Sequence, residues 1–179
     1  DSIWGSGDFY DFSKLATTQQ VIVITVNYRL GLFGWFSSEH LRNTSTGLDK
    51  SSNFGQLDLI KGLEWVQQNI SAFGGDKENV TIFGESAGGH NVLTLLASPL
   101  SKGLFHKAIS QSGYVSSYTQ KFAEEESELS SKKIFADEIK FLVSDTEIAD
   151  YLRSLSSEEV YQKYKAKAER LYEGKNLKN

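Results

Sequence analysis

The chain has 179 residues, of which 39% are apolar and 23% charged, a balance that fits one sizeable hydrophobic core and excludes a disordered or fibrous protein. Its formal net charge of −4 is spread over both signs without a basic stripe, so we expect no nucleic acid among its partners. Without cysteine there is no disulfide and no cysteine nucleophile, and no apolar run approaches the ~18 residues that span a bilayer.

The first predicted element is a buried strand near the start of the chain. Residues Val21 to Val26 form a continuous apolar and β-branched run of strand length, which is typical of a central strand covered on both faces in a parallel sheet. In the segment Asn27 to Phe36, two glycines among aromatic residues predict a bend where the backbone passes close to other groups. A polar stretch from Ser37 to Ser52 then predicts a surface loop.

The middle of the chain alternates between helix and strand patterns. A helix is predicted from Asn53 to Ile70, because one face collects the apolar residues Leu59, Ile60, Leu63, Val66 and Ile70. The glycine-containing segment Phe73 to Asp76 ends it. Asn79 to Phe83 predicts a short strand, Ala87 to Ala97 a helix, and Lys107 to Ser110 a further strand. This order predicts an α/β fold with a parallel sheet and right-handed crossovers.

The character of the chain changes near residue 116. Residues 1–115 are predicted to hold the sheet core, and residues 116–179 form a charged helical segment of the same single domain. Its charge runs, which include Glu124-Glu125-Glu126 and the lysines at 163, 165 and 167, predict solvated helix faces. The chain opens with Asp1 and no signal peptide, so we expect its natural start to lie further upstream.

The stretch Gly84-Glu85-Ser86-Ala87-Gly88 matches the G-x-S-x-G pattern of a nucleophile elbow. A serine on a sharp turn between a strand and a helix has a strained backbone that bulky neighbours would block. The match lies between a predicted strand and a predicted apolar helix, which favours a nucleophile at Ser86 over a plain structural turn. The helix would begin at Ala87, so the N–H of Ala87 would face an oxyanion formed at Ser86.

A serine nucleophile needs a base that takes its proton and a third group that orients the base. His90 lies one turn beyond Ser86 and is predicted to pack rather than to catalyse. His40 precedes the serine, out of the order serine, acid, histidine, and His106 follows it with no acid-bearing strand between them. We therefore expect the base to lie outside this chain. No H-E-x-x-H or similar spacing predicts a metal site in its place.

Several stretches resemble the type-B carboxylesterase and cholinesterase-like family, and the likeness covers most of the chain. The most specific runs through the elbow, from Val80 to Gly89. The other matching stretches are Val21 to Gly34 with its N-Y-R-x-G-x-x-G bend, Asn53-Phe54-Gly55 with Asp58, Trp65-Val66, Asn69 to Asp76, Gln111-Ser112-Gly113 and, more weakly, Tyr151 to Ser156. Lys77, Gln56 and Leu59 depart from the family's usual residues at positions away from the chemistry.

The resemblance implies an α/β-hydrolase fold, with a mostly parallel sheet and flanking helices, of which this chain holds a partial domain. It implies hydrolysis of small-molecule carboxylic esters through an acyl-enzyme on Ser86, with the N–H of Ala87 as one oxyanion donor and no cofactor or metal. Family members carry an H-G-G-G-like donor motif just before the segment that resembles Trp4 to Asp8, and their acid and histidine lie well downstream of Asn179. We therefore expect an internal fragment that by itself folds poorly and has little or no esterase activity.

Two alternatives stay open at this point. The first is a non-catalytic binding or adhesion protein of the same cholinesterase-like fold, although an intact elbow serine argues against it. The second is a serine peptidase or thioesterase, because fold and nucleophile do not determine the acyl substrate. Outside the elbow, Arg29 and Asp58 are expected to form a buried pair that braces the bend. Ser112 is either a hydrogen-bonding residue near the triad or an ordinary strand-end serine. The oligomeric state is open.

Overall fold

The computed structural model describes residues 5–176, and side chains as far as residue 171. The chain forms two compact units, each taken here by itself. The first holds residues up to Gly34 together with Asn53–Ser116, and the second holds Trp35–Ser52 and the chain from Ser117 onward. Residues 35–52 thus belong with the C-terminal part of the sequence. That both units form a single domain stays a prediction.

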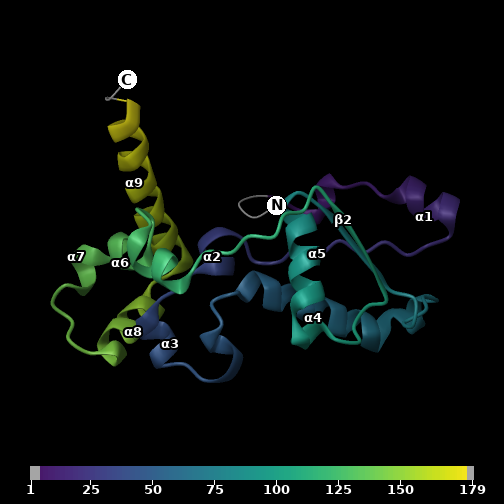
Figure 1. Ribbon diagram of the computed structural model, residues 1–179, viewed down its shortest axis with the longest axis horizontal. Helices are drawn as coiled ribbons and strands as arrows, with labels where there is room; N and C mark the ends of the chain where they lie inside the picture. Colours follow the sequence, from purple (N-terminus) through teal and green to yellow (C-terminus); the bar gives the residue numbers. More distant parts are fainter. Residues whose placement is uncertain (1–4, 177–179) are drawn as a thin grey trace. The chain divides into compact units, whose positions relative to one another are not determined.

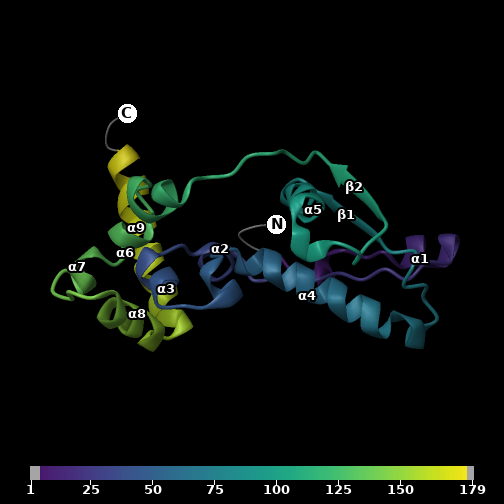
Figure 2. The ribbon, with the colours of Figure 1, turned by 60° about the horizontal axis from the view of Figure 1, so that its bottom comes forward.

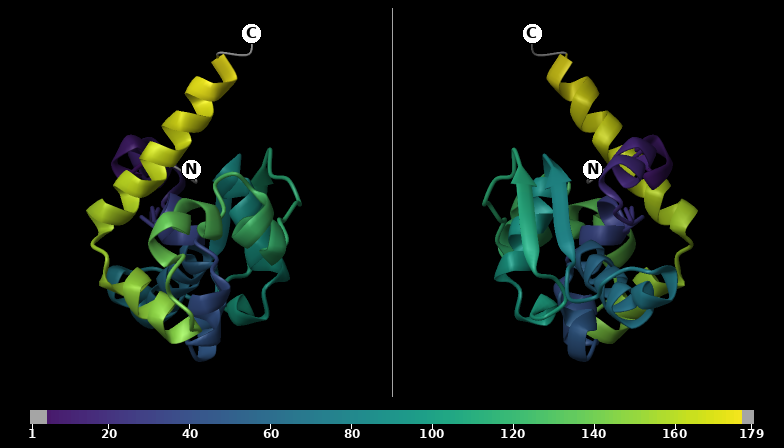
Figure 3. Two further views of the ribbon diagram at one scale, coloured as in Figure 1. Left: turned by 90° about the vertical axis from the view of Figure 1, so that its left-hand side faces the viewer. Right: turned by 90° about the vertical axis from the view of Figure 1, so that its right-hand side faces the viewer.

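The first unit is built on two parallel strands, β1 (Thr81–Glu85) and β2 (Lys107–Gln111), which are joined by the helix α5 (Ala87–Ala97) (Figure 1). The register pairs Thr81 with Lys107 and Glu85 with Gln111, and the two arrows run side by side in Figure 3. Both predicted strands and the predicted helix are therefore confirmed, with strand ends shifted by one or two residues.

The core of this unit lies between α4 (Phe54–Asn69), α5 and the strands. Its buried side chains are Ile60, Ile82, Val92 and Leu95. The apolar face predicted for the helix is confirmed, since Ile60 and Val66 are buried and Leu59 and Leu63 pack against the core at its edge. The spacing of the apolar residues places them all on one side of α4, and this side faces α5. The unit also contains η1 (Gly7–Phe9), α1 (Ser13–Gln19), η3 (Ile70–Phe73) and η4 (Pro99–Ser101).

The strand predicted at Val21–Val26 is wrong for this chain. These residues carry neither helix nor strand, and they run as an irregular segment after α1 (Figure 2). A strand exists only where a neighbour completes its backbone hydrogen bonds, and β1 and β2 are paired with each other across one edge. Val21 and Ile22 are 46% and 47% exposed, far from what their apolar composition predicts for a central strand.

The bend after this segment is confirmed in its geometry. A Cβ placed on Gly34 would lie 2.3 Å from the carbonyl oxygen of Arg29, so only glycine fits in α2 (Gly31–Trp35) at this close approach. Arg29 donates from Nη2 to Asp58 Oδ1 at 2.7 Å and from Nε to Oδ2 at 2.8 Å, and its backbone N–H donates to Oδ2 at 2.9 Å. The expected pair therefore exists, but it is not buried, because the two side chains are 51% and 26% exposed.

Replacing Asp58 with asparagine is expected to lower the free energy of unfolding by about 1 kcal/mol at neutral pH. The side-chain hydrogen bonds of Arg29 hold the pKa of Asp58 below its ordinary value. The stabilisation is therefore present above the ordinary pKa of an aspartate and is lost as the pH falls through the lowered one. Urea unfolding at neutral and acidic pH should show the difference between Asp58→Asn and the original protein shrinking in acid.

A matched control is available on the same helix. Glu64 pairs with Lys61 at 2.8 Å, but Lys61 is 80% exposed. Because exposed pairs contribute little, Glu64→Gln should change the free energy of unfolding by at most about 0.5 kcal/mol. Equal losses in Asp58→Asn and Glu64→Gln would contradict a bracing role for the Arg29 pair.

In its described part the second unit contains helices and no strand. Its elements are α3 (Glu39–Asn43), η2 (Gly47–Lys50), η5 (Phe122–Glu126, a single π-helical turn), α6 (Ser131–Ile134), α7 (Ala136–Ile139), α8 (Asp145–Ser154) and α9 (Ser157–Asn176). Phe135 is its most buried large side chain and meets the ring of Phe36 edge-on at 5.8 Å. The predicted surface loop at Ser37–Ser52 is corrected here, because α3 packs on α8, and Ser37 and Ser38 are buried.

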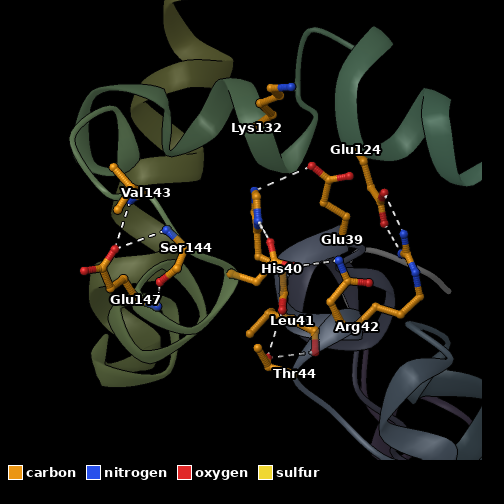
Figure 4. A network of polar contacts seen from close by, with 12 residues as sticks. Glu39, His40, Leu41, Arg42, Thr44, Glu124, Lys132, Val143, Ser144 and Glu147 are labelled. Carbon is orange, nitrogen blue, oxygen red and sulfur yellow. Dashed lines mark hydrogen bonds and ion pairs between the residues drawn. The ribbon is translucent and has the colours of Figure 1, made fainter.

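The charge run at Glu124 is also not a purely solvated face. Glu124 is buried, and it accepts a hydrogen bond from Ser37 Oγ at 2.6 Å. Both terminal nitrogens of Arg42 also donate to it (Figure 4). Burial raises the pKa of this carboxyl, but the hydrogen bonds of Arg42 and Ser37 outweigh it and leave the pKa lowered. A polar sequence pattern cannot show this, because the partners lie more than 80 residues away.

Candidate active site

The residue between β1 and α5 is Ser86, and its backbone dihedral angles lie in a region that residues other than glycine rarely adopt. Its φ is 54° and its ψ is −117°. Such strain persists only where the surroundings hold the chain in place. Here the Ser86 N–H donates to the carbonyl of Gln111 at 2.9 Å, and the His90 N–H donates to the carbonyl of Ser86 at 2.9 Å. Ser86 itself is exposed at the end of the strand.

The turn is tight because two glycines flank it. A Cβ on Gly84 would lie 2.4 Å from the carbonyl carbon of Gly88 and 2.5 Å from its oxygen. Both contacts are with backbone, which cannot rotate away as a side chain can. The strand therefore passes directly against the first turn of the helix, as the elbow pattern predicts.

The start of α5 supplies free donors beside Ser86. Ala87 is the first residue of the helix, so no carbonyl one turn earlier within the helix accepts from its N–H. The partial positive charge of a helix N-terminus favours an anion there. Ala87 follows Ser86 directly in the chain, so its N–H belongs to the helix N-terminus next to the serine.

The three histidines all have other partners. His90 Nδ1 lies 2.5 Å from the carbonyl oxygen of Tyr114, and the two rings stack with centroids 4.7 Å apart. His106 Nδ1 accepts from the Val80 N–H at 3.3 Å. The predicted packing of His90 is thus confirmed, and the described contacts of these two histidines do not include Ser86.

His40 lies in the second unit and forms the pair that most resembles part of a triad. Its Nδ1 is 2.7 Å from Asp145 Oδ1, and its Nε2 is 3.8 Å from Glu39 (Figure 4). The hydrogen bond of His40 lowers the pKa of Asp145, with a second contribution from Asn43. These contacts join α3 to the start of α8, so the structure gives the pair a role in packing within its unit.

Sequence reasoning missed the partners of the elbow on β2. The acceptor for the Ser86 N–H is a backbone carbonyl, that of Gln111, and the Tyr114 carbonyl that His90 contacts lies 24 residues further along the chain. Backbone acceptors carry no signature in residue identity. Only the parallel pairing of Glu85 with Gln111 would have pointed to them, because it places the residues after the two strands side by side.

An open cavity of ≈ 690 Å³ borders β1. It is lined largely by apolar residues of the Val21–Val26 segment, α4 and β1, and it reaches Glu85 and Gly88 at the elbow. Within residues 5–171, no cluster of three or more histidine and carboxylate side chains is arranged to hold a metal ion. None of the described helices is long and apolar enough to cross a membrane.

Comparison with known proteins points in one direction. The carboxylesterase family model matches residues 1–176. Over 109 residues the chain is 55% identical to the para-nitrobenzyl esterase of Bacillus subtilis (strain 168), which covers 61% of this chain and 21% of that protein. Over 111 residues it is 50% identical to liver carboxylesterase 1 of Oryctolagus cuniculus, covering 61% of this chain and 18% of the relative. The matched region thus spans about a fifth of these relatives.

Solved structures agree over a longer stretch. A thermophilic pNB esterase superposes with a TM-score of 0.74 at 36% identity, covering 95% of this chain and 32% of that one. The carboxylesterase EST55 of Geobacillus stearothermophilus at pH 6.8 gives a TM-score of 0.74 at 36% identity, covering 90% and 34%. Because these structures cover 95% and 90% of this chain, the likeness extends beyond the two strands and α5 to nearly all of it.

Proposed function

Because the chain belongs to the carboxylesterase family and holds part of an α/β-hydrolase fold, we propose that it carries the nucleophile of a carboxylic ester hydrolase, Ser86. The observation that carries the proposal is the exposed Ser86 on a strained turn between β1 and α5. A structural turn would gain nothing from a non-glycine residue in this conformation, whereas a nucleophile must project from the sheet toward its substrate.

The chemistry proceeds in two steps. Ser86 Oγ attacks the carbonyl carbon of the ester, its proton passes to a base, and the carbonyl oxygen becomes an oxyanion that accepts from the Ala87 N–H. The C–O bond to the alcohol then breaks, and the alcohol leaves with that proton. Water attacks the acyl-enzyme by the same route, which releases the carboxylic acid and restores the Ser86 hydroxyl.

The base and its orienting acid belong to other parts of the natural protein in this proposal. Support comes from the three histidines of this chain, because each contacts a residue other than Ser86. His90 contacts Tyr114, His106 contacts Val80, and His40 contacts Asp145. The open cavity beside β1 also supports the proposal, because a largely apolar space of that size is a place where more of the natural protein would pack. The substrate is a small-molecule carboxylic ester.

A fluorophosphonate probe tests the proposal directly. Treating the natural protein that contains this chain should modify Ser86, which mass spectrometry would find in the tryptic peptide from Glu78 to Lys102. The isolated 179-residue chain, treated in parallel, should react far more slowly and should hydrolyse nitrophenyl esters little above background, because its serine lacks a base.

Either arm can refute part of the idea. A natural protein whose peptide stays unmodified would favour the non-catalytic binding protein. Full ester hydrolysis by the isolated chain would instead mean that one of its own histidines serves as the base.

A further inference from the structure

Two serines with left-handed backbone lie side by side at the ends of the paired strands. Ser86 follows Glu85 with φ 54°, and Ser112 follows Gln111 with φ 51°. Because Glu85 and Gln111 are register partners, the two strained residues leave the sheet at the same edge. Left-handed backbone at a non-glycine residue is unfavourable, so the surrounding contacts must hold both turns in place.

The backbone after β2 is packed tightly on the first turn of α5. A Cβ on Gly89 would lie 2.7 Å from the carbonyl oxygen of Gln111 and 2.9 Å from the Cα of Gly113. Ser110 Oγ also donates to the carbonyl of Gly89 at 3.0 Å. The Gln111 carbonyl that accepts from Ser86 is thus held from the α5 side, and any movement of this segment would move that acceptor.

His90 is the side chain that ties down the far end of this segment. It rises from α5 one turn after Ser86, and its ring stacks on Tyr114 with an interplanar angle of 26°. The Tyr114 carbonyl can only accept, so His90 Nδ1 must carry the hydrogen in their 2.5 Å contact. This contact comes two residues after the strained Ser112 and closes the segment onto the helix.

We propose that His90 is a positioning residue for Ser86, acting through the hydrogen bond to Tyr114 that holds the segment from Gln111 to Tyr114. The inference rests on the proposed function of Ser86 as a nucleophile. His90 does not touch the substrate in this proposal. It fixes the carbonyl of Gln111, which in turn fixes the Ser86 N–H and the direction of the hydroxyl.

Two variants separate the hydrogen bond from the ring stack. His90→Phe keeps a ring beside Tyr114 but removes the donor, whereas His90→Asn removes the ring and keeps an amide donor near the position of Nδ1. In the natural protein, His90→Phe should lower kcat per reactive serine about five- to tenfold, with KM unchanged, and should slow fluorophosphonate labelling of Ser86 by the same factor. His90→Asn should restore most of the rate.

The rates are compared per reactive serine, and the reactive serines are counted by complete labelling. A folding defect then does not affect the comparison, because misfolded copies lower the number of sites and not the rate at each site. His106→Asn is the matched control, since that histidine contacts Val80 away from the elbow, and it should leave the rate per site unchanged. Equal rates per site in His90→Phe and the original protein would overturn the proposal, as would a loss confined to the number of sites.

Other outcomes also decide the matter. A collapse of kcat by a thousandfold or more, with a lost limb in the pH profile, would make His90 the base and refute a positioning role. An original protein that is not labelled at Ser86 would refute the proposed function itself and the positioning role with it. Labelling at Ser86 with no difference among the variants would refute the positioning role alone.

Discussion

Ester hydrolysis by the natural protein should fall by at least about a thousandfold in kcat/KM when Ser86 is replaced with alanine. The expectation follows from covalent catalysis, because without the hydroxyl no acyl-enzyme can form and only the binding and donor contributions of the site remain. Hydrolysis of a nitrophenyl ester, followed at matched protein concentrations, measures the loss. The variant should fold normally, since Ser86 is exposed and alanine keeps the same Cβ.

Ser112→Ala is the matched control for this prediction. Ser112 is also a serine with left-handed backbone at the end of a strand, and the residues before the two serines, Glu85 and Gln111, are register partners. If it only supports the site, its loss should cost at most about tenfold in kcat/KM. Similar losses of kcat/KM in the two variants would show that activity depends equally on both strained serines, and this would contradict a nucleophilic role specific to Ser86.

Replacing Gly84 with alanine is expected to lower the free energy of unfolding by about 3 kcal/mol. The new Cβ would lie 2.4 Å from the carbonyl carbon of Gly88, so β1 and α5 would have to separate. That movement would open the core between them, where Ile82 packs with Val92 and Leu95. Urea unfolding of the natural protein measures the loss, and labelling of Ser86 should fall with it because the elbow depends on the same contact.

The glycine on the other side of that contact gives the control. A Cβ on Gly88 would meet nothing within 4 Å among the described residues. Because alanine is the better helix former, Gly88→Ala should leave the free energy of unfolding unchanged or raise it by about 0.5–1 kcal/mol. If Gly88→Ala lowered the free energy of unfolding as much as Gly84→Ala, the loss could not be attributed to the clash of a Cβ at position 84 with Gly88.

Local patterns were enough to predict the elements around the elbow. The apolar period of α4, the alternation of strand and helix, and the two glycines beside Ser86 each act over a few residues, so they can be read directly along the chain. The same local stretches carry the family resemblance, which the comparisons confirm. The roles of Ser86 and Ala87 stay predictions until labelling and kinetics test them.

Predictions failed where a residue depends on a distant partner. The Val21–Val26 segment has the composition of a buried strand, yet among residues 5–176 it has no ladder partner, and it borders an open cavity. Glu124 has the context of a solvated helix, yet Arg42 and Ser37 bury it. In both cases composition describes what a residue tolerates, whereas its surroundings are set by segments far away in the sequence.

The sequence by itself determined the family, the order of strands and helices around the elbow, and the position of the serine, because each rests on residues close together in the chain. Only the tertiary structure decided that the Gln111 carbonyl accepts from Ser86, that His90 contacts the Tyr114 carbonyl, and that the pair of Arg29 and Asp58 is partly exposed and not buried. These contacts join residues 24 to 29 positions apart, and two of them end on backbone carbonyls, which every residue has.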